Sequence, residues 1–237
     1  MSLTQAPTAA AHVAPSALAT KVAAIAAALL AVSLFMTVAV INVPHDPSDQ
    51  ELLTWWQDPG NRWTGLMSGI WALLVAVTVP VVMNHLQRLD AATRSPQWLS
   101  FARSMGGAVT AVWLVTGAAR STLGHLVDTM NEPLPGVDVL RFSTGMNYTL
   151  LGQSGMAVLA LCMLAVSIVV LRTRVFGRWL GYLGGGCSAA MLAAVAAQYG
   201  AYTTPLAILW ALGLAVAILR QPPADASLVH GSRTPVD

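Results

Sequence analysis

Charged side chains are scarce in this chain. Only 9% of its 237 residues are Asp, Glu, Lys or Arg, whereas 56% are hydrophobic. A soluble domain usually carries about 25% charged residues, and so few charges cannot cover a surface that faces water. Most of the surface must therefore face lipid, and the composition indicates an integral membrane protein with the bilayer as its main partner.

The chain also lacks the signals of cofactor and nucleic-acid binding. Its two cysteines, Cys162 and Cys187, lie inside apolar runs, where we expect small packing residues rather than a disulfide framework. The net charge of +2 comes without a basic run and indicates no nucleic-acid partner. No phosphate loop or dinucleotide fingerprint precedes a helix, and no histidines pair at metal-ligand spacing. We therefore expect neither a cofactor nor a metal.

Long uncharged runs dominate the sequence instead. A helix that crosses a bilayer needs about 20 mostly apolar residues. Four runs of suitable length cover residues 22–43, 64–86, 99–119 and 142–171, and the third is uncharged from Ser104 to Ala119. A fifth stretch, residues 179–219, has no charged side chain and is about twice the length of one span. Its centre, Gly200 to Pro205, is turn-forming, so the stretch predicts two helices.

These runs predict an all-α, polytopic transmembrane bundle of six spans over residues 21–220. We expect the flanking segments, residues 1–20 and 221–237, to be disordered cytoplasmic tails. Cytoplasmic loops are enriched in Lys and Arg. Nine of the twelve basic residues fall at the two termini and in the second and fourth loops. The sequence therefore predicts that both termini face the cytoplasm.

The first outer loop carries a helix signature. Ser48 followed by Glu51 forms a capping box, and Asp58-Pro59-Gly60 ends the segment. We expect a short helix over residues 49–57, with Leu52, Leu53 and Trp56 turned to lipid or to the bundle. It either lies at the outer membrane surface with its tryptophans among the headgroups, or packs on the bundle as a capped loop helix.

Small residues predict close contacts between helices. Gly65 and Gly69, and likewise Gly181 and Gly185, have the small-xxx-small spacing that lets membrane helices approach each other. With Gly184 and Gly186 beside the second pair, we expect the fifth spanning helix to run through the middle of the bundle.

Polar residues collect toward the predicted outer ends of the helices, where they mark a candidate site. Arg120 is either an anion or headgroup contact at the floor of an outward-facing cavity, or an arginine that snorkels outward or pairs with Asp128 or Glu132. The candidate ligand-binding residues are Arg120, His125, Asn147, Gln153, Gln198 and Tyr199. The helix interiors carry no ionisable relay and the chain has no inverted repeat, which argues against a coupled transporter.

Three segments carry a resemblance to a known family. They are residues 48–58 with Asn61 and Arg62, residues 147–151, and residues 171–184. On these segments the chain resembles a family of small bacterial six-helix membrane proteins of unknown function. Family members often have proline where this chain has Gly177. The resemblance implies a six-helix fold, and it transfers no reaction and no catalytic residue. We expect the chain to lie in the inner (plasma) membrane.

Three functions fit these observations. The first is binding of a lipid-like or other apolar small molecule from the outer face. The second is an isoprenoid- or lipid-modifying enzyme similar to small polytopic terpene cyclases, in which a carboxylic acid protonates the substrate. The candidate acids are Glu51, Asp58, Asp128 and Glu132. The third is a partner subunit that stabilises another membrane protein.

Overall fold

The computed structural model describes residues 16–40, 43, 47–90 and 96–221. Within these ranges every regular element is a helix and no strand occurs, so the predicted all-α class is confirmed. The first helix begins at Ala17, inside the predicted N-terminal tail. The other residues of the predicted tails, apart from Ser16 and Gln221, lie outside the described residues.

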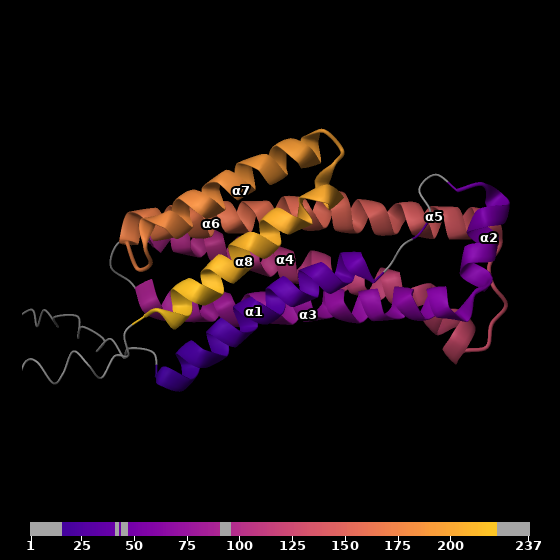
Figure 1. The fold of residues 1–237 in the computed structure, drawn as a ribbon, viewed down its shortest axis with the longest axis horizontal. Helices are drawn as coiled ribbons and strands as arrows, with labels where there is room; N and C mark the ends of the chain where they lie inside the picture. Colours follow the sequence, from indigo (N-terminus) through magenta and orange to yellow (C-terminus); the bar gives the residue numbers. More distant parts are fainter. Residues whose placement is uncertain (1–15, 41–42, 44–46, 91–95, 222–237) are drawn as a thin grey trace, which may run out of the picture.

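The helices follow one another through the described ranges as Figure 1 labels them. The α-helices are α1 (Ala17–Ala39), α2 (Asp49–Gln57), α3 (Pro59–Asp90), α4 (Pro96–Gly124), α5 (Val137–Tyr148), α6 (Met156–Thr173), α7 (Arg178–Ala196) and α8 (Thr204–Leu219). A π-helical turn, η1 (His125–Thr129), continues α4, and a second, η2 (Thr149–Gly155), joins α5 to α6. A 3-10 turn, η3 (Gly200–Thr203), precedes α8.

Five of these helical segments are long and apolar enough to cross a membrane. They are Ala17–Ala39, Pro59–Leu89, Val137–Thr173, Arg178–Ala196 and Gly200–Leu219. The last two confirm that the uncharged stretch at residues 179–219 folds back at Gly200 as a helical hairpin. α4 is not among the five, because Arg103 and Arg120 lie near its ends and reduce its apolar character.

The long helices form a closed ring in which neighbours in sequence are neighbours in space. α3 packs on α1 and α4, α6 packs on α4 and α7, and α8 packs on α7 and closes the ring against α1. The start of α1 and the end of α8 lie at one end of the bundle, and α2 lies at the other (Figure 1). We call these the terminal end and the α2 end.

The main hydrophobic core fills the ring between the terminal end and the level of η2. It includes fully buried large side chains from separate helices, such as Leu30, Trp113, Met163 and Trp210. A second, smaller core of Leu52, Trp56, Leu123 and Leu140 joins α2 to α4 and α5 at the α2 end. The fold therefore has a long helical ring with a small cap of its own core at one end.

The helix from Val137 to Thr173 is longer than a membrane is thick. Its 37 residues correspond to about 55 Å, whereas the hydrocarbon core of a bilayer measures about 30 Å. α7 and α8 are shorter, and their connecting turn meets this helix partway along, where Gly200 lies against Gly152. The part that includes α5 therefore extends past the α7–α8 hairpin toward α2.

The expected central position of the fifth spanning helix is wrong. In α7, only 33% of the spanning window is buried, against 61% for the Val137–Thr173 helix. Gly181 and Gly184 do pack closely on α6, against Leu171 and Ser167. A side chain on Gly185 would meet nothing within 4 Å. The small residues thus bring one face of α7 onto α6 and leave α7 at the periphery.

Candidate functional site

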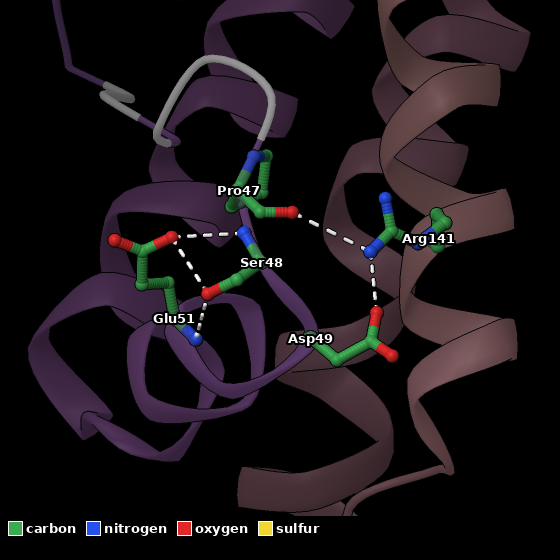
Figure 2. Close-up of polar contacts among 5 residues, drawn as sticks. All are labelled: Pro47, Ser48, Asp49, Glu51 and Arg141. Carbon is green, nitrogen blue, oxygen red and sulfur yellow. Dashed lines mark hydrogen bonds and ion pairs between the residues drawn. The ribbon is translucent and has the colours of Figure 1, made fainter.

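α2 begins with the hydrogen bonds that the sequence predicts. The Ser48 backbone N–H and hydroxyl each donate to Oε2 of Glu51 at 2.8 Å, and the Glu51 N–H donates to the Ser48 hydroxyl at 3.3 Å (Figure 2). The hydrogen bond from the Ser48 backbone, followed by that from its hydroxyl, lowers the pKa of Glu51 because both stabilise the carboxylate. The helix spans Asp49–Gln57, so the predicted capping box and helix bounds are confirmed.

The C-terminus of α2 is capped by the first residues of α3. Asn61 donates from its amide nitrogen to the carbonyl of Trp55 at 3.0 Å. Nη1 of Arg62 donates to the carbonyls of Trp56 and Gln57, at 2.9 and 2.8 Å. The last carbonyls of a helix have no partner within the helix, and here the next helix supplies the donors. Asn61 and Arg62, which follow the loop helix in the sequence, therefore serve as its C-terminal cap.

α2 packs on the bundle, which is one of the two arrangements that the sequence left open. Leu52 and Trp56 are 1% and 2% exposed and contact the smaller core, and Leu53 packs against them. Arg141 of α5 pairs with Asp49 and donates to the Pro47 carbonyl at 3.4 Å (Figure 2). α2 is thus tied to α5 at its start and to α3 at its end.

Three of the four candidate acids take part in hydrogen bonds that shape the α2 end. Glu51 completes the capping box, and Oδ1 of Asp58 accepts from the Gly60 N–H at 2.8 Å at the start of α3. Asp128 pairs with Arg62, with Oδ1 at 2.7 Å from Nη2. Glu132 is exposed in the segment after η1. A role for any of them as a proton donor stays a prediction.

Arg120 is a buried cation without a partner in the described part of the chain. Its relative exposure is 7%, and its Nε and Nη1 atoms are buried with no hydrogen-bond acceptor. The sequence offered Asp128 and Glu132 as partners, but Asp128 pairs with Arg62 instead. A buried charge without a hydrogen-bond partner is costly, and two of the three guanidinium nitrogens of Arg120 are in that position.

The α5 helix supplies polar groups at the level of Arg120. Trp113 of α4 lies 3.5 Å from the place that a side chain on Gly155 would take. The two helices run antiparallel. Arg120 is seven residues after Trp113 in α4, and Tyr148 is seven residues before Gly155, so Arg120 and Tyr148 lie at the same level. The Tyr148 phenol is close enough to interact electrostatically with Arg120. α4 and α5 therefore face each other here.

Two further buried polar atoms lie on that face of α5. Thr144, Asn147 and Tyr148 occupy positions i, i+3 and i+4 and share one side of the helix. Thr144 Oγ1 and Asn147 Oδ1 are both buried without a hydrogen-bond partner. The Arg120 guanidinium on α4 and these two unpaired polar atoms on α5 thus lie at a similar level of the bundle, and no described hydrogen bond joins them. The sequence marks Arg120 and Asn147 as candidates, and the spacing of Thr144, three residues before Asn147 on one helix, is the signal for the third.

The other predicted ligand-binding residues are more dispersed. Gln153 is half-buried in η2, whereas His125, Gln198 and Tyr199 are exposed. Gln198 has a left-handed backbone with φ of 69° where α7 gives way to the turn. Gly200 packs against Gly152, so this turn adjoins η2, but no described contact joins Gln153 to Gln198. The candidate site is therefore smaller than the predicted set and centres on Arg120.

Both π-helical turns flank the candidate site. η1 begins five residues after Arg120, and η2 begins immediately after Tyr148. π-helical turns are rare and occur often at functional sites, where they change the direction of side chains. Their position at the ends of α4 and α5 agrees with a specialised region around Arg120.

Comparisons of the chain with protein-family models, with curated proteins and with solved structures give no match. The resemblance to a six-helix family of unknown function therefore stays an expectation from the sequence. The class that the fold itself defines is a helical membrane protein with at least five candidate spans.

Proposed function

We propose that the chain crosses the inner (plasma) membrane of a bacterial cell six times, with α4 as the sixth span and both termini in the cytoplasm. α4 packs between α3 and the α5–α6 helix, which are both long enough to span. From Trp98 to Arg120 it covers about 33 Å, enough for the hydrocarbon core. The start of α1, the end of α8 and the arginines at the end of α6 and the start of α7 share the terminal end, which supports a cytoplasmic position for it.

Exposed aromatic residues support this placement of the bilayer. Trp179 and the half-buried Trp98 lie toward the terminal end, whereas Tyr148, Tyr199 and Tyr202 lie toward the α2 end. Tryptophan and tyrosine are enriched at the two membrane–water interfaces. Arg120 then lies at the level of the outer headgroups.

The function that this geometry supports best is binding of an anionic, lipid-like molecule from the outer face. The observation that carries the proposal is the buried Arg120 guanidinium with unpartnered Nε and Nη1 atoms. A phosphate or carboxylate group would satisfy these donors with charge-assisted hydrogen bonds. A hydroxyl on the same molecule would donate to Asn147 Oδ1 and accept from the Thr144 hydroxyl. The ligand class is therefore an amphiphile with an anionic group and a neighbouring hydroxyl.

The test uses the full chain purified in a neutral detergent. Binding of lysophosphatidylglycerol, which has both features, is measured by native mass spectrometry and compared with lysophosphatidylcholine. Arg120→Gln should weaken lysophosphatidylglycerol binding by about tenfold or more, the effect of losing hydrogen bonds to a charged group. Arg178→Gln is the control, because Arg178 is exposed at the opposite end of the bundle.

Equal binding by the wild type and Arg120→Gln would refute the proposal. The proposal would also fail if Arg120→Gln kept the preference for lysophosphatidylglycerol and had a higher thermal stability. That result would show that the buried Arg120 charge destabilises the fold and binds no ligand. Asn147→Leu provides a second variant, which should weaken binding without removing the charge. The enzyme and partner-subunit functions stay predictions from the sequence.

A further inference from the structure

Three arginines gather around the connection between α6 and α7, at the terminal end of the bundle (Figure 1). The guanidinium carbon of Arg172, near the end of α6, lies 5.4 Å from the ring centre of Trp98 at the start of α4. Arg103, further along α4, lines a small crevice together with Thr173 and so lies beside the end of α6. Arg174 follows Thr173 in the chain. We call Arg103, Arg172 and Arg174 the arginine cluster.

The loop that carries Arg174 is anchored on both sides. Thr173 and Phe176 are each 5% exposed. The Thr173 hydroxyl donates to the Val169 carbonyl at 2.9 Å and accepts from the Val175 N–H at 3.4 Å. Arg174 ends α6 with a left-handed backbone, at a φ of 57°, which is uncommon for a residue other than glycine. The backbone of Arg174 is thus fixed, while its side chain stays exposed at the surface.

The arginine cluster has no counter-charge in the described part of the chain. All three side chains are exposed, and none forms an ion pair with a described residue. The acidic side chains that the structure describes lie at the α2 end: Asp49, Glu51, Asp58, Asp128, Glu132 and Asp138. The contact of Arg172 with the Trp98 ring uses the face of the guanidinium and leaves its N–H groups free to donate. Positive potential therefore accumulates here and attracts anions.

Tryptophans place the arginine cluster at a membrane–water interface. Trp98, which contacts Arg172, is half-buried, and Trp179, at the start of α7, is 45% exposed. Tryptophan is enriched at the level of the lipid headgroups. An anion that binds Arg172 and its neighbours at this depth lies among the phosphates of the lipids, so a lipid headgroup is the ligand that fits this position.

We propose that the arginine cluster binds the headgroup of a phospholipid that carries two phosphates. Arginine binds phosphate through paired, charge-assisted hydrogen bonds. Three cations from α4, α6 and the following loop exceed the charge of one phosphodiester and suit two. Basic sites between transmembrane helices bind headgroups of this kind. The acyl chains stay in the bilayer, so the site needs no cavity. It uses no residue of the Arg120 site.

The experiment uses the full chain in a neutral detergent and measures lipid binding by native mass spectrometry. Cardiolipin, which has two phosphates, is compared with phosphatidylglycerol, which has one. Cardiolipin should bind about fivefold more tightly, the upper range for one additional pair of exposed charges. The ratio of the two affinities is then compared between the wild type and variants, because the larger number of acyl chains in cardiolipin affects all of them equally.

Variants of the arginine cluster should reduce this ratio. Arg103→Gln, Arg172→Gln and Arg174→Gln should each weaken cardiolipin binding about threefold to fivefold. Arg220→Gln is the matched control, because Arg220 is exposed at the same end on α8, across the ring from α4 and α6. It removes the same charge and should leave the ratio unchanged.

Two further variants separate the contributions. Trp98→Leu keeps every charge but removes the ring that holds Arg172, and it should weaken cardiolipin binding about twofold. Arg120→Gln should not change cardiolipin binding, so failure of this proposal and failure of the Arg120 proposal are distinguishable. Thermal unfolding without lipid checks that each variant is folded.

Equal losses in Arg220→Gln and in the variants of the arginine cluster would overturn the proposal, because they would show general attraction to a basic end. An unchanged ratio in all three cluster variants would also overturn it. Inorganic pyrophosphate at the concentration of cardiolipin should not displace the lipid. Full displacement would assign the arginine cluster to a soluble anion instead.

Discussion

Arg62 and Asp128 form an ion pair between residues that are 66 positions apart in the sequence. Nη2 of Arg62 lies 2.7 Å from Oδ1 of Asp128, and Nε donates to the same oxygen at 2.8 Å. The same guanidinium donates to two carbonyls at the end of α2. One buried side chain near the start of α3 therefore fixes both the loop helix and the π-helical end of α4.

Removing this ion pair should destabilise the α2 end. Asp128→Asn should cost about 1–2 kcal/mol, at the lower part of the range for hydrogen bonds to charged groups, because the Asp128 side chain is 40% exposed. Arg62→Met should cost more, because α2 also loses two cap donors. Thermal unfolding in detergent measures both. Asp49→Asn breaks the exposed pair with Arg141 and should change stability by less than about 1 kcal/mol.

Ser48→Ala should loosen α2 without disturbing the rest of the bundle. The substitution removes the hydroxyl that accepts from the Glu51 N–H, and the loss of such a cap costs about 0.5–2 kcal/mol. Hydrogen exchange of the α2 amides should accelerate, while exchange in α6 should not change. Equal acceleration in α6 would show that α2 is not a locally stabilised unit.

The capping box should also make α2 sensitive to acid. The pKa of Glu51 is lowered in the folded protein by the hydrogen bonds from Ser48. A lowered pKa stabilises the fold above the ordinary value of 4.5, and this contribution disappears as the pH falls through the lowered value. Exchange of the α2 amides, corrected for intrinsic rates, should therefore increase below about pH 4.5. Glu51→Gln should abolish that dependence, and persistence of the full effect in this variant would assign it to another group.

Gly69 should be far less tolerant of alanine than Gly107. A Cβ atom on Gly69 would lie 2.1 Å from the Ser121 hydroxyl and 2.7 Å from the Gly117 carbonyl, whereas one on Gly107 would meet nothing within 4 Å. Gly69→Ala should therefore cost about 1–3 kcal/mol as α3 and α4 move apart. Gly107→Ala should be neutral or stabilising by up to about 1 kcal/mol, because alanine favours the helix. Similar losses of thermal stability in both variants would contradict the close α3–α4 contact.

The proposed orientation can be tested with single cysteines in a background without Cys162 and Cys187. Ser48, Thr129 and Gln97 are all exposed, so an introduced thiol can react at each. An impermeant thiol reagent added to intact cells should label positions 48 and 129. Position 97 should react only after the membrane is permeabilised. Labelling of position 97 in intact cells would reverse the orientation.

Local signals in the sequence predicted several elements correctly. The Ser48–Glu51 capping box and the Asp58-Pro59-Gly60 stop predict both ends of the nine-residue helix α2. They can do so because a capping box depends only on residues close together in the sequence. The uncharged stretch at residues 179–219 is too long for one span, and Gly200–Thr203 provides the turn between α7 and α8. These features required no knowledge of distant contacts.

Features that depend on tertiary placement were harder to predict. The sequence indicates a span over residues 142–171, but the helix begins at Val137 because α5 packs on α2 outside the expected span. The sequence offers Asp128 as a partner for Arg120, but α3 approaches η1 in the fold, so Asp128 pairs with Arg62 instead. In α7, the small residues indicate close packing against a neighbouring helix, but they do not indicate how many faces of α7 are packed. Charge and spacing mark candidates, and the neighbouring helix decides their roles.

The contact between α1 and α8 has a consequence for how the chain is made. Every other contact of the ring joins helices that emerge from the ribosome one after the other, so each hairpin can assemble during synthesis. The first helix, by contrast, must wait in the bilayer until the last one arrives. During that time the face of α1 that later packs on α8 has no partner from this chain. Closure of the ring is thus governed by α8, the last helix in the part of the chain that the structure describes.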